Sequence, residues 1–339
     1  MTGINRQWVL KQRPNGPIGP DNFEMVDALV PDVGPGQALV ENLYLAMDPA
    51  IRNFLNDNGG YAAPIAISAP IRGMILGRVR ASGAADICVG DLVWGFGTWS
   101  DYSLAPVAGL IPIPHPQGDL ADYLHRRGTI GLTAHYGIFD IAQVKPGDQV
   151  LISGAAGAVG SLAGQMARLA GATRVVGIAG GARKCARVVE DYGFDACIDY
   201  KAEDDISTQM RTQMPQGVDV YFDNVGGKIL EAAIGQLSDD GRVAICGMIS
   251  GYDERSAQPG PSNLWNLVVH SALIRGFRVT SILGNRPLVA AKLAQIDTWI
   301  DQGALRADYD VRHGLDAVPA AFASLFDGSN DGRLLVQLR

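Results

Sequence analysis

The chain has 339 residues, of which 47% are hydrophobic and 19% charged, enough to form about two domains with large cores. Its 42 glycines and 18 prolines are typical of short strands joined by tight turns, and they exclude a coiled coil or a disordered chain. A net charge of −7 without a basic block argues against nucleic acid or an anionic membrane surface as a partner.

No apolar run approaches the roughly 20 residues that cross a bilayer, and residues 1–10 lack the apolar centre of a signal peptide. We therefore expect a cytoplasmic protein with no membrane partner.

The N-terminal third carries short strand-like runs separated by proline and glycine clusters, a pattern that predicts a β-rich region. These runs lie at 37–45, 74–79 and 91–95. From Gln149 onward, β-branched runs alternate with longer amphipathic segments, which is typical of repeated βαβ units and a parallel sheet.

Six strands are predicted in this second region, with helices between them. The strands are expected at 149–153, 174–178, 195–199, 218–223, 242–247 and 274–279, and three of the helices at 158–170, 182–192 and 227–237. Six parallel strands make a complete doubly wound (Rossmann) sheet, so the fold class is α/β. A last strand-like run at 333–338 follows this set, and we expect it to rejoin the N-terminal region.

A glycine turn follows the first of these strands directly and opens the helix near Ala158. In such a turn Gly157 lets the backbone approach a pyrophosphate, and Gly160 allows close packing of helix on strand. The first fingerprint position is Ala155 instead of glycine. The context predicts a dinucleotide diphosphate on Gly157, Ala158, Val159 and Gly160, the alternative being a turn that binds nothing.

The end of the second strand distinguishes between NAD and NADP. An NAD site places an acid there to hold the ribose hydroxyl, whereas residues 179–184 contain no acid and end in Arg183 and Lys184. Because two bases attract a 2′-phosphate, we expect NADPH. The alternative is that both charges simply face solvent.

The cysteines and histidines do not predict a metal. Cys88, Cys185, Cys197 and Cys246 are widely spaced, with no C-x-x-C pair and no histidine at ligand spacing. We expect reduced thiols and no metal site.

Six further observations come from the segments 45–49, 131–134, 153–161, 221–227, 245–250 and 319–322. Together these segments resemble the zinc-independent branch of the medium-chain dehydrogenase/reductase superfamily, and within it the prostaglandin reductases (leukotriene B4 12-hydroxydehydrogenases), curcumin reductases and 2-alkenal reductases. The resemblance covers nearly the whole chain. It implies a GroES-like lobe formed by 1–125 with a C-terminal return at 301–339, a Rossmann NADPH-binding domain at 126–300, and a homodimer.

The resemblance also implies which residues line the cofactor. Lys184 and Tyr200 match positions at the adenosine phosphate end. The remaining matches lie along the cofactor and are Asn224, Cys246, Gly247, Met248, Ile249, Ser250, Gly251, Tyr252, Phe277, Arg278, Val279 and Asn330.

The implied reaction is reduction of a carbon–carbon double bond conjugated to a carbonyl, in an enone or alkenal. Without zinc, the resulting oxyanion needs a hydrogen-bond donor, and Tyr61 and Tyr252 match family tyrosines near the substrate and the nicotinamide ribose. Each tyrosine has a plain alternative as a packed or solvent-facing aromatic. Ala50 stands where the family usually has a tyrosine, so the substrate pocket is expected to differ there.

The aromatic segment 94–99 is a candidate wall for an apolar substrate through Phe96 and Trp99, with core packing as the alternative. Two other functions also remain open: an NADPH quinone oxidoreductase of the same superfamily, and an NADPH-binding protein without turnover. A zinc alcohol dehydrogenase is disfavoured because its ligand set is missing.

Overall fold

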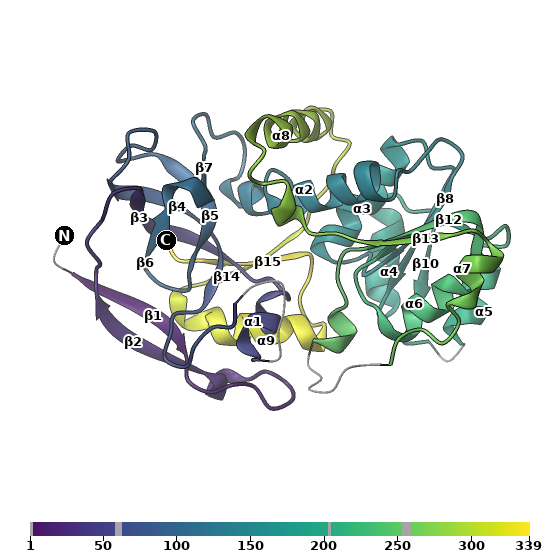
Figure 1. Ribbon diagram of the computed structural model, residues 1–339, viewed down its shortest axis with the longest axis horizontal. Helices are drawn as coiled ribbons and strands as arrows, with labels where there is room; N and C mark the ends of the chain where they lie inside the picture. The colour runs from purple at the N-terminus through teal and green to yellow at the C-terminus, as the bar shows by residue number, and fades with distance from the viewer. Residues whose placement is uncertain (1–2, 58–62, 203–204, 253–258) are drawn as a thin grey trace. The chain divides into compact units, whose positions relative to one another are not determined.

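The computed structural model describes residues 3–57, 63–202, 205–252 and 259–339. The chain forms two compact units, the first of Met1–Leu124 with Tyr309–Arg339 and the second of His125–Asp308. Both chain ends belong to unit 1 (Figure 1).

Unit 1 is β-rich. Among its described residues, β1 (Ile4–Leu10) and β2 (Phe23–Leu29) form an antiparallel pair. A larger sheet has the order β14 (Tyr309–His313), β15 (Arg333–Gln337), β3 (Gln37–Ala46), β4 (Arg72–Ser82), β5 (Leu92–Thr98), β7 (Leu110–Pro112), and β6 (Tyr102–Pro106) pairs with β3. Its helical segments are η1 (Pro20–Asn22), α1 (Ile51–Leu55), η2 (Val107–Gly109), η3 (Leu120–Leu124), η7 (Leu315–Ala317) and α9 (Val318–Asp327).

The C-terminal strand is an integral part of unit 1. β15 pairs antiparallel with β3, with Leu335 opposite Ala46, so residues nearly 300 positions apart share one ladder. Beneath the sheet, Trp99 is fully buried, with its ring 5.5 Å from that of Phe23 and 5.2 Å from that of Phe322. These aromatic contacts join the N-terminal hairpin, the sheet and helix α9 in one core.

Unit 2 contains the parallel sheet. Its strands are β8 (Gln149–Ser153), β9 (Arg174–Ala179), β10 (Ala196–Asp199), β11 (Val218–Asp223), β12 (Leu237–Ile245) and β13 (Leu273–Gly276). Its helical segments are α2 (Thr129–His135), the π-helix η4 (Tyr136–Ile141), α3 (Ala158–Leu169), α4 (Ala182–Glu190), α5 (Ile206–Gln213), α6 (Gly227–Ile234), η5 (Ile249–Gly251), α7 (Trp265–Val269), η6 (Val279–Ser281) and α8 (Arg286–Asp301).

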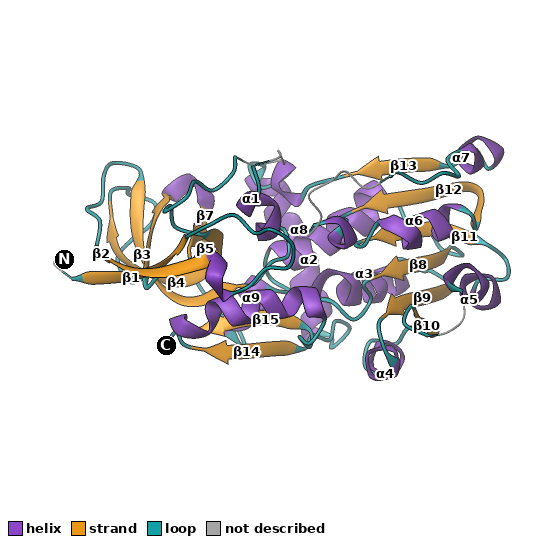
Figure 2. Ribbon diagram, turned by 90° about the horizontal axis from the view of Figure 1, so that it is seen from below, coloured by secondary structure: helices purple, strands orange, loops and turns teal. Residues whose placement is uncertain are grey.

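The strand order in the described part of this sheet is β10-β9-β8-β11-β12-β13, which can be followed from strand to strand in Figure 2. Both faces are buried because side chains alternate along each strand: Val150 and Ile152 join one core with α3, while Leu151 joins the other with α6. The predicted α/β class with a doubly wound parallel sheet and a β-rich region is confirmed.

The strands predicted at 242–247 and 274–279 end earlier in the structure than expected. β12 stops at Ile245 because the next two amides, of Cys246 and Gly247, both donate to the Asp223 carbonyl, which turns the chain away from the ladder. β13 ends at Gly276, just before the segment that forms η6.

Candidate functional site

The sheet reverses its winding between β8 and β11, which are neighbours although they are far apart in the chain. In a doubly wound sheet this switch point opens a crevice outside the carboxyl ends of the strands, where a dinucleotide binds. The glycine turn after β8 and Asn224 after β11 both lie at this point.

Steric contacts fix the glycine turn. Gly154 takes the left-handed conformation with φ of 61°, and its carbonyl accepts a hydrogen bond from the Gly157 amide at 2.9 Å. A Cβ on Gly160 would lie 2.3 Å from the same carbonyl oxygen, so only glycine fits there. The amides of Ala158, Val159 and Gly160 precede the first backbone bond of α3, from Ser161 to Gly157, and so lie at the positive end of the helix.

The alanine at the first fingerprint position has a structural explanation. The left-handed residue in this turn is Gly154, so Ala155 needs no unusual backbone. Its methyl group is fully buried, and a Cβ on Gly177 of β9 would lie 2.7 Å from it. The glycine in the neighbouring strand therefore provides the room that Ala155 occupies.

A buried carboxylate ties the two central strand ends together. Asp223 is fully buried, and its Oδ1 accepts hydrogen bonds from the Ser153 hydroxyl at 2.9 Å and the Tyr221 hydroxyl at 2.7 Å. The same carboxylate accepts the amides of Val225 and Gly226. Sequence reasoning did not single out Asp223, and its position at the end of an apolar strand was the available signal.

Asn224 is anchored on the glycine turn. Its Nδ2 donates to the Ser153 carbonyl at 2.7 Å, and its amide donates to the Ser153 hydroxyl at 2.9 Å. These bonds join β8 and β11 at their carboxyl ends, beside the turn that begins at Gly154.

The segment after β12 folds back over the segment after β11. The Ile249 amide donates to the Asn224 carbonyl, and the Ser250 amide and hydroxyl both donate to the Val225 carbonyl. The Tyr252 hydroxyl accepts the Met248 amide at 3.3 Å, and a Cβ on Gly247 would lie 3.2 Å from that hydroxyl. The structure thus brings together Asn224 and the predicted stretch from Cys246 to Tyr252.

The Cys246 thiol within this segment is not prepared for covalent chemistry. Burial, followed by the nearby Asp223 charge, raises the pKa of the Cys246 thiol to about 12. The neutral thiol therefore prevails near pH 7, so we assign it no nucleophilic role.

The basic end of the site lies where β9 enters α4. Gly181 has φ of 90° and immediately precedes the helix in which Arg183 is exposed and Lys184 half-buried. The Tyr200 ring lies against Gly180, because a Cβ there would be 2.8 Å from the Tyr200 hydroxyl. Tyr200 and the start of α4, where the resemblance implies contacts with an adenosine phosphate, are thus neighbours in unit 2.

Three charged residues near this end escaped the sequence analysis. Asp199 ends β10, and its Oδ1 accepts the amides of Gly181 at 2.7 Å and Lys201 at 2.9 Å, so backbone donors neutralise part of its charge. The Lys201 ammonium lies 6.0 Å from the Tyr200 ring centroid. Arg187 donates to the Ala156 carbonyl of the glycine turn at 3.4 Å, and its position one helical turn after Arg183 was the signal that could have found it.

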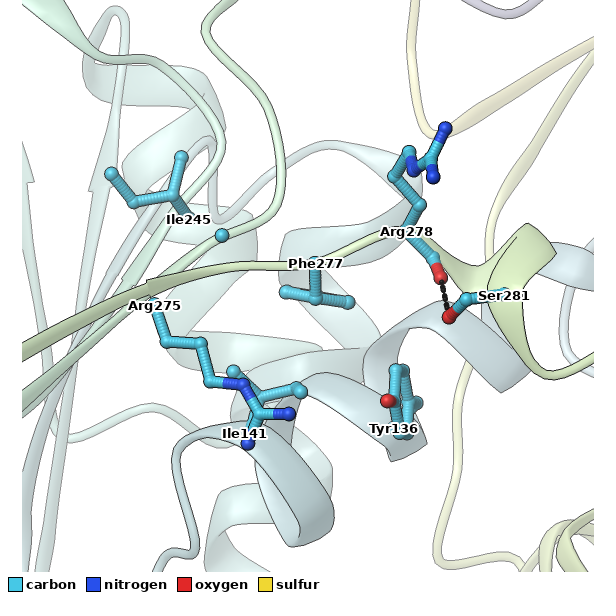
Figure 3. A pocket seen from close by; sticks show the side chains of 8 residues that line it. Tyr136, Ile141, Ile245, Arg275, Phe277, Arg278 and Ser281 are labelled. Carbon is cyan, nitrogen blue, oxygen red and sulfur yellow. Dashed lines mark hydrogen bonds between the residues drawn. The ribbon is translucent and has the colours of Figure 1, made fainter. Parts of the chain in front are cut away.

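The predicted residues Phe277, Arg278 and Val279 leave β13 beside a cavity of about 450 Å³ (Figure 3). The Phe277 ring packs edge-on against Tyr136, with centroids 5.7 Å apart, and against Phe222 at 6.0 Å. The residues that line the cavity are Tyr136, Ile141, Ile245, Arg275, Gly276, Phe277, Arg278 and Ser281.

The remaining predicted residues belong to unit 1, apart from Tyr61, which lies outside the described residues. Asn330 is half-buried, and its side-chain amide donates to the Gly332 carbonyl at 3.3 Å. Phe96 is 46% exposed, whereas Trp99 is fully buried in the core, which supports the packing alternative for Trp99. Ala50 caps the start of α1 and is half-buried.

The described residues contain no group of three or more His, Cys, Asp or Glu side chains that could hold a metal ion. Within the same part of the chain, no helix combines the length and apolarity needed to cross a membrane.

Two family models match the sequence, "N-terminal domain of oxidoreductase" over residues 6–113 and "Zinc-binding dehydrogenase" over 158–295. With the doubly wound sheet and the glycine turn at its switch point, these matches define a nucleotide-binding oxidoreductase.

Relatives and solved structures match over nearly the whole chain. It is 34% identical to the NADPH-dependent curcumin reductase of Escherichia coli (strain K12), over 98% of this chain and 97% of that protein. It is 35% identical to the 2-alkenal reductase (NADP(+)-dependent) of Nicotiana tabacum, with the same coverage of 98% and 97%. The crystal structure of CurA from Vibrio vulnificus in complex with NADPH matches with a TM-score of 0.91 and 34% identity, covering 98% of this chain and 99% of that chain.

The chain belongs to the zinc-independent medium-chain dehydrogenase/reductase family that contains the curcumin, 2-alkenal and prostaglandin reductases. The resemblance found in the sequence is confirmed.

Proposed function

We propose that this protein uses NADPH to reduce the carbon–carbon double bond of α,β-unsaturated carbonyl compounds, without a metal. The observation that carries the proposal is the carboxyl edge of the parallel sheet, where the glycine turn, Asn224 and the basic start of α4 follow neighbouring strands. Full-length relatives whose names state reduction of curcumin and of 2-alkenals support the substrate class.

The residues at this edge fit a phosphorylated dinucleotide. Gly160 packs so closely on the Gly154 carbonyl that a side chain would clash there. The turn is therefore tight, and a diphosphate can approach the first amides of α3. In this proposal Arg183, Lys184 and Tyr200 hold the adenosine phosphate, and Arg187 adds positive charge behind the turn. When bound, NADPH supplies the hydride.

The remaining cofactor contacts of the proposal come from the family positions. They are Gly157, Ala158, Val159, Asn224, Cys246, Gly247, Met248, Ile249, Ser250, Gly251, Phe277, Arg278, Val279 and Asn330. The proposal also keeps 1–125 with 301–339 as the GroES-like lobe and 126–300 as the NADPH-binding domain.

Reduction of a conjugated double bond places negative charge on the carbonyl oxygen, and a hydrogen-bond donor must stabilise that charge. We assign this role to the Tyr252 hydroxyl, which is held near Gly247 by the Met248 amide. Tyr61 is proposed as a second tyrosine of the site on the resemblance alone, and Phe96 as part of the substrate wall.

Absorbance at 340 nm tests the reaction directly. We expect the purified protein to consume NADPH with trans-3-nonen-2-one and with trans-2-nonenal, and to prefer NADPH to NADH. Turnover with 1,4-benzoquinone but with neither conjugated substrate would establish the quinone reductase alternative. Binding of NADPH with no consumption of it in any of these assays would establish the non-catalytic alternative.

Replacement of Tyr252 by phenylalanine separates its chemical role from cofactor binding. Loss of one oxyanion donor costs about 100-fold in kcat, and we expect a fall of this order in Tyr252→Phe while the Kd for NADPH changes less than about threefold. Stopped-flow measurement of NADPH oxidation gives the first quantity, and nucleotide fluorescence gives the second. An unchanged kcat removes Tyr252 from the catalytic role.

A homodimer joined through the far edge of the parallel sheet is part of the proposal. In the described part of the chain β13 pairs with β12 alone, so its outer edge can receive a strand. Beside it, Trp265 and Val268 of α7 are 72% and 63% exposed, and Leu273 is 56% exposed. Apolar side chains gathered in this way are typical of a surface that a partner covers.

Light scattering tests the dimer. We expect twice the chain mass for the natural protein and a monomer for Trp265→Glu combined with Val268→Asp. Val89→Asp is the matched control, because Val89 is 66% exposed but lies in unit 1. A monomeric natural protein contradicts this part of the proposal.

The proposed cytoplasmic location is supported by the state of the thiols, since all four cysteines are free. Cell fractionation with a tagged chain tests it.

A further inference from the structure

The cavity beside Phe277 lies in unit 2, next to the carboxyl ends of β12 and β13 (Figure 3). Its volume of about 450 Å³ is in the range that holds small organic ligands. One wall comes from the π-helix η4, through Tyr136 and Ile141, and the opposite wall from the chain between Arg275 and Ser281.

The charge of this cavity differs from that of the protein as a whole. Its eight described lining residues include two arginines and no acid, although the net charge of the chain is −7. Figure 3 shows the Arg275 side chain running from β13 toward η4, whereas the Arg278 side chain points the other way. Arg275 is therefore the cation that an occupant would meet.

The apolar part of the cavity has a fixed shape. Phe277 is held edge-on between Tyr136 and Phe222, with interplanar angles of 76° and 72°. Gly137 makes this packing possible, because a Cβ there would lie 2.3 Å from the Phe222 ring and 2.7 Å from the Phe277 ring. A flat apolar group can pack on such a surface without first ordering it.

Tyr136 is also contacted by a lysine of α8. The Lys292 ammonium lies 5.8 Å from the Tyr136 ring centroid, and it donates to the Asp140 carboxylate at 2.6 Å. The buried Lys292 side chain therefore contacts η4 at both Tyr136 and Asp140.

We propose that this cavity is a ligand site for a small carboxylate with a flat apolar body. The guanidinium of Arg275 matches a carboxylate with two parallel hydrogen bonds, and Phe277 with Ile141 and Ile245 provides the apolar surface for the body. A free phosphate would leave these apolar walls unused, so the combination selects an amphipathic acid. The cavity shares Phe277 and Arg278 with the proposed cofactor contacts, so the site is tested in the absence of nucleotide.

Calorimetry on the full chain without nucleotide tests the site, with 2-naphthoate as the probe and neutral 2-naphthamide as its matched analogue. We expect naphthoate to bind at least about tenfold more tightly than naphthamide, as a charge-assisted pair predicts. Arg275→Gln should abolish this preference by weakening naphthoate alone. Arg211→Gln, which changes an exposed arginine of α5 in the same unit, should leave both affinities unchanged.

Equal affinities for naphthoate and naphthamide overturn the proposal, and so does tight naphthoate binding that survives in Arg275→Gln. Equal weakening by Arg275→Gln and Arg211→Gln also overturns it, because it would reveal a general charge effect. NADPH binding is followed separately by fluorescence. If the natural protein binds naphthoate but does not bind NADPH, the proposed function is contradicted and the carboxylate site is not.

Discussion

The glycine turn and the start of α4 follow neighbouring strands, β8 and β9, yet they are built in different ways. The turn is held by backbone contacts and buried bonds, with a carbonyl oxygen 2.3 Å from any Cβ on Gly160. The start of α4 instead presents side chains, with Arg183 exposed and Tyr200 50% exposed. Gly160 in the first region cannot accept a side chain, whereas single charges in the second region can be changed without a steric clash.

This difference has a functional meaning. Every dinucleotide carries a diphosphate, so the part that binds it is best made of rigid backbone. The extra phosphate distinguishes NADPH from NADH, and surface charges suffice to recognise it. We therefore expect changes at the turn to weaken binding of both nucleotides equally, and changes at α4 to alter the preference between them.

The largest effect is expected at the turn. Gly160→Ala places a methyl group against the Gly154 backbone, which cannot move away without breaking the entry to α3. We expect affinities for NADPH and NADH to fall together by about 100-fold, the upper end of overpacking costs. Nucleotide fluorescence measures both. Gly284→Ala serves as the control because nothing lies within 4 Å of a Cβ there, and an unaffected Gly160→Ala would refute the steric account.

A smaller effect on binding, with a clear loss of stability, is expected for Asp223→Ala. The substitution leaves the Ser153 and Tyr221 hydroxyls and two backbone amides without their buried acceptor. We expect the free energy of unfolding to fall by about 3 kcal/mol and nucleotide affinity by about 30-fold, since Asn224 loses its support. Denaturant titration and fluorescence measure the two quantities. Asp239→Ala, whose carboxylate is 88% exposed, should change neither.

The smallest effect is expected at α4, and it should be selective. Arg183→Gln and Lys184→Gln should each lower the NADPH affinity about tenfold at low salt, and less as the ionic strength rises. NADH affinity should stay the same. The ratio of kcat/KM for the two nucleotides measures this selectivity, with Arg211→Gln as the control. If both variants lower the NADPH and NADH affinities equally, the start of α4 does not select between the nucleotides and the comparison with the glycine turn is wrong.

Much of the fold followed from local patterns. Strand-like runs of five or six residues predicted the six parallel strands, and the order strand, glycine turn, helix predicted where α3 begins. The basic pair after β9 was also predictable, because residues 179–184 contain two adjacent bases and no acid. These features can be predicted from the sequence because each depends on residues that are close together in the chain.

Other parts of the site depended on contacts between distant segments. Ala155 breaks the glycine fingerprint, and only its contact with Gly177 of β9 explains why the turn accepts it. Trp99 looked like a candidate substrate wall, but its packing on Phe23 and Phe322 places it in the core. An aromatic residue looks the same in sequence whether its ring lies in a core or in a pocket.

The sequence by itself determined the doubly wound sheet, and it predicted a diphosphate turn and a preference for a phosphorylated nucleotide. Short-range sterics and charge encode each of these features. Only the tertiary structure decided that Asp223 joins the two central strands, that Arg187 reaches the glycine turn, and that Arg275 faces an apolar cavity. These three features arise where strand order brings distant segments together, and residue spacing along the chain carries no record of that order.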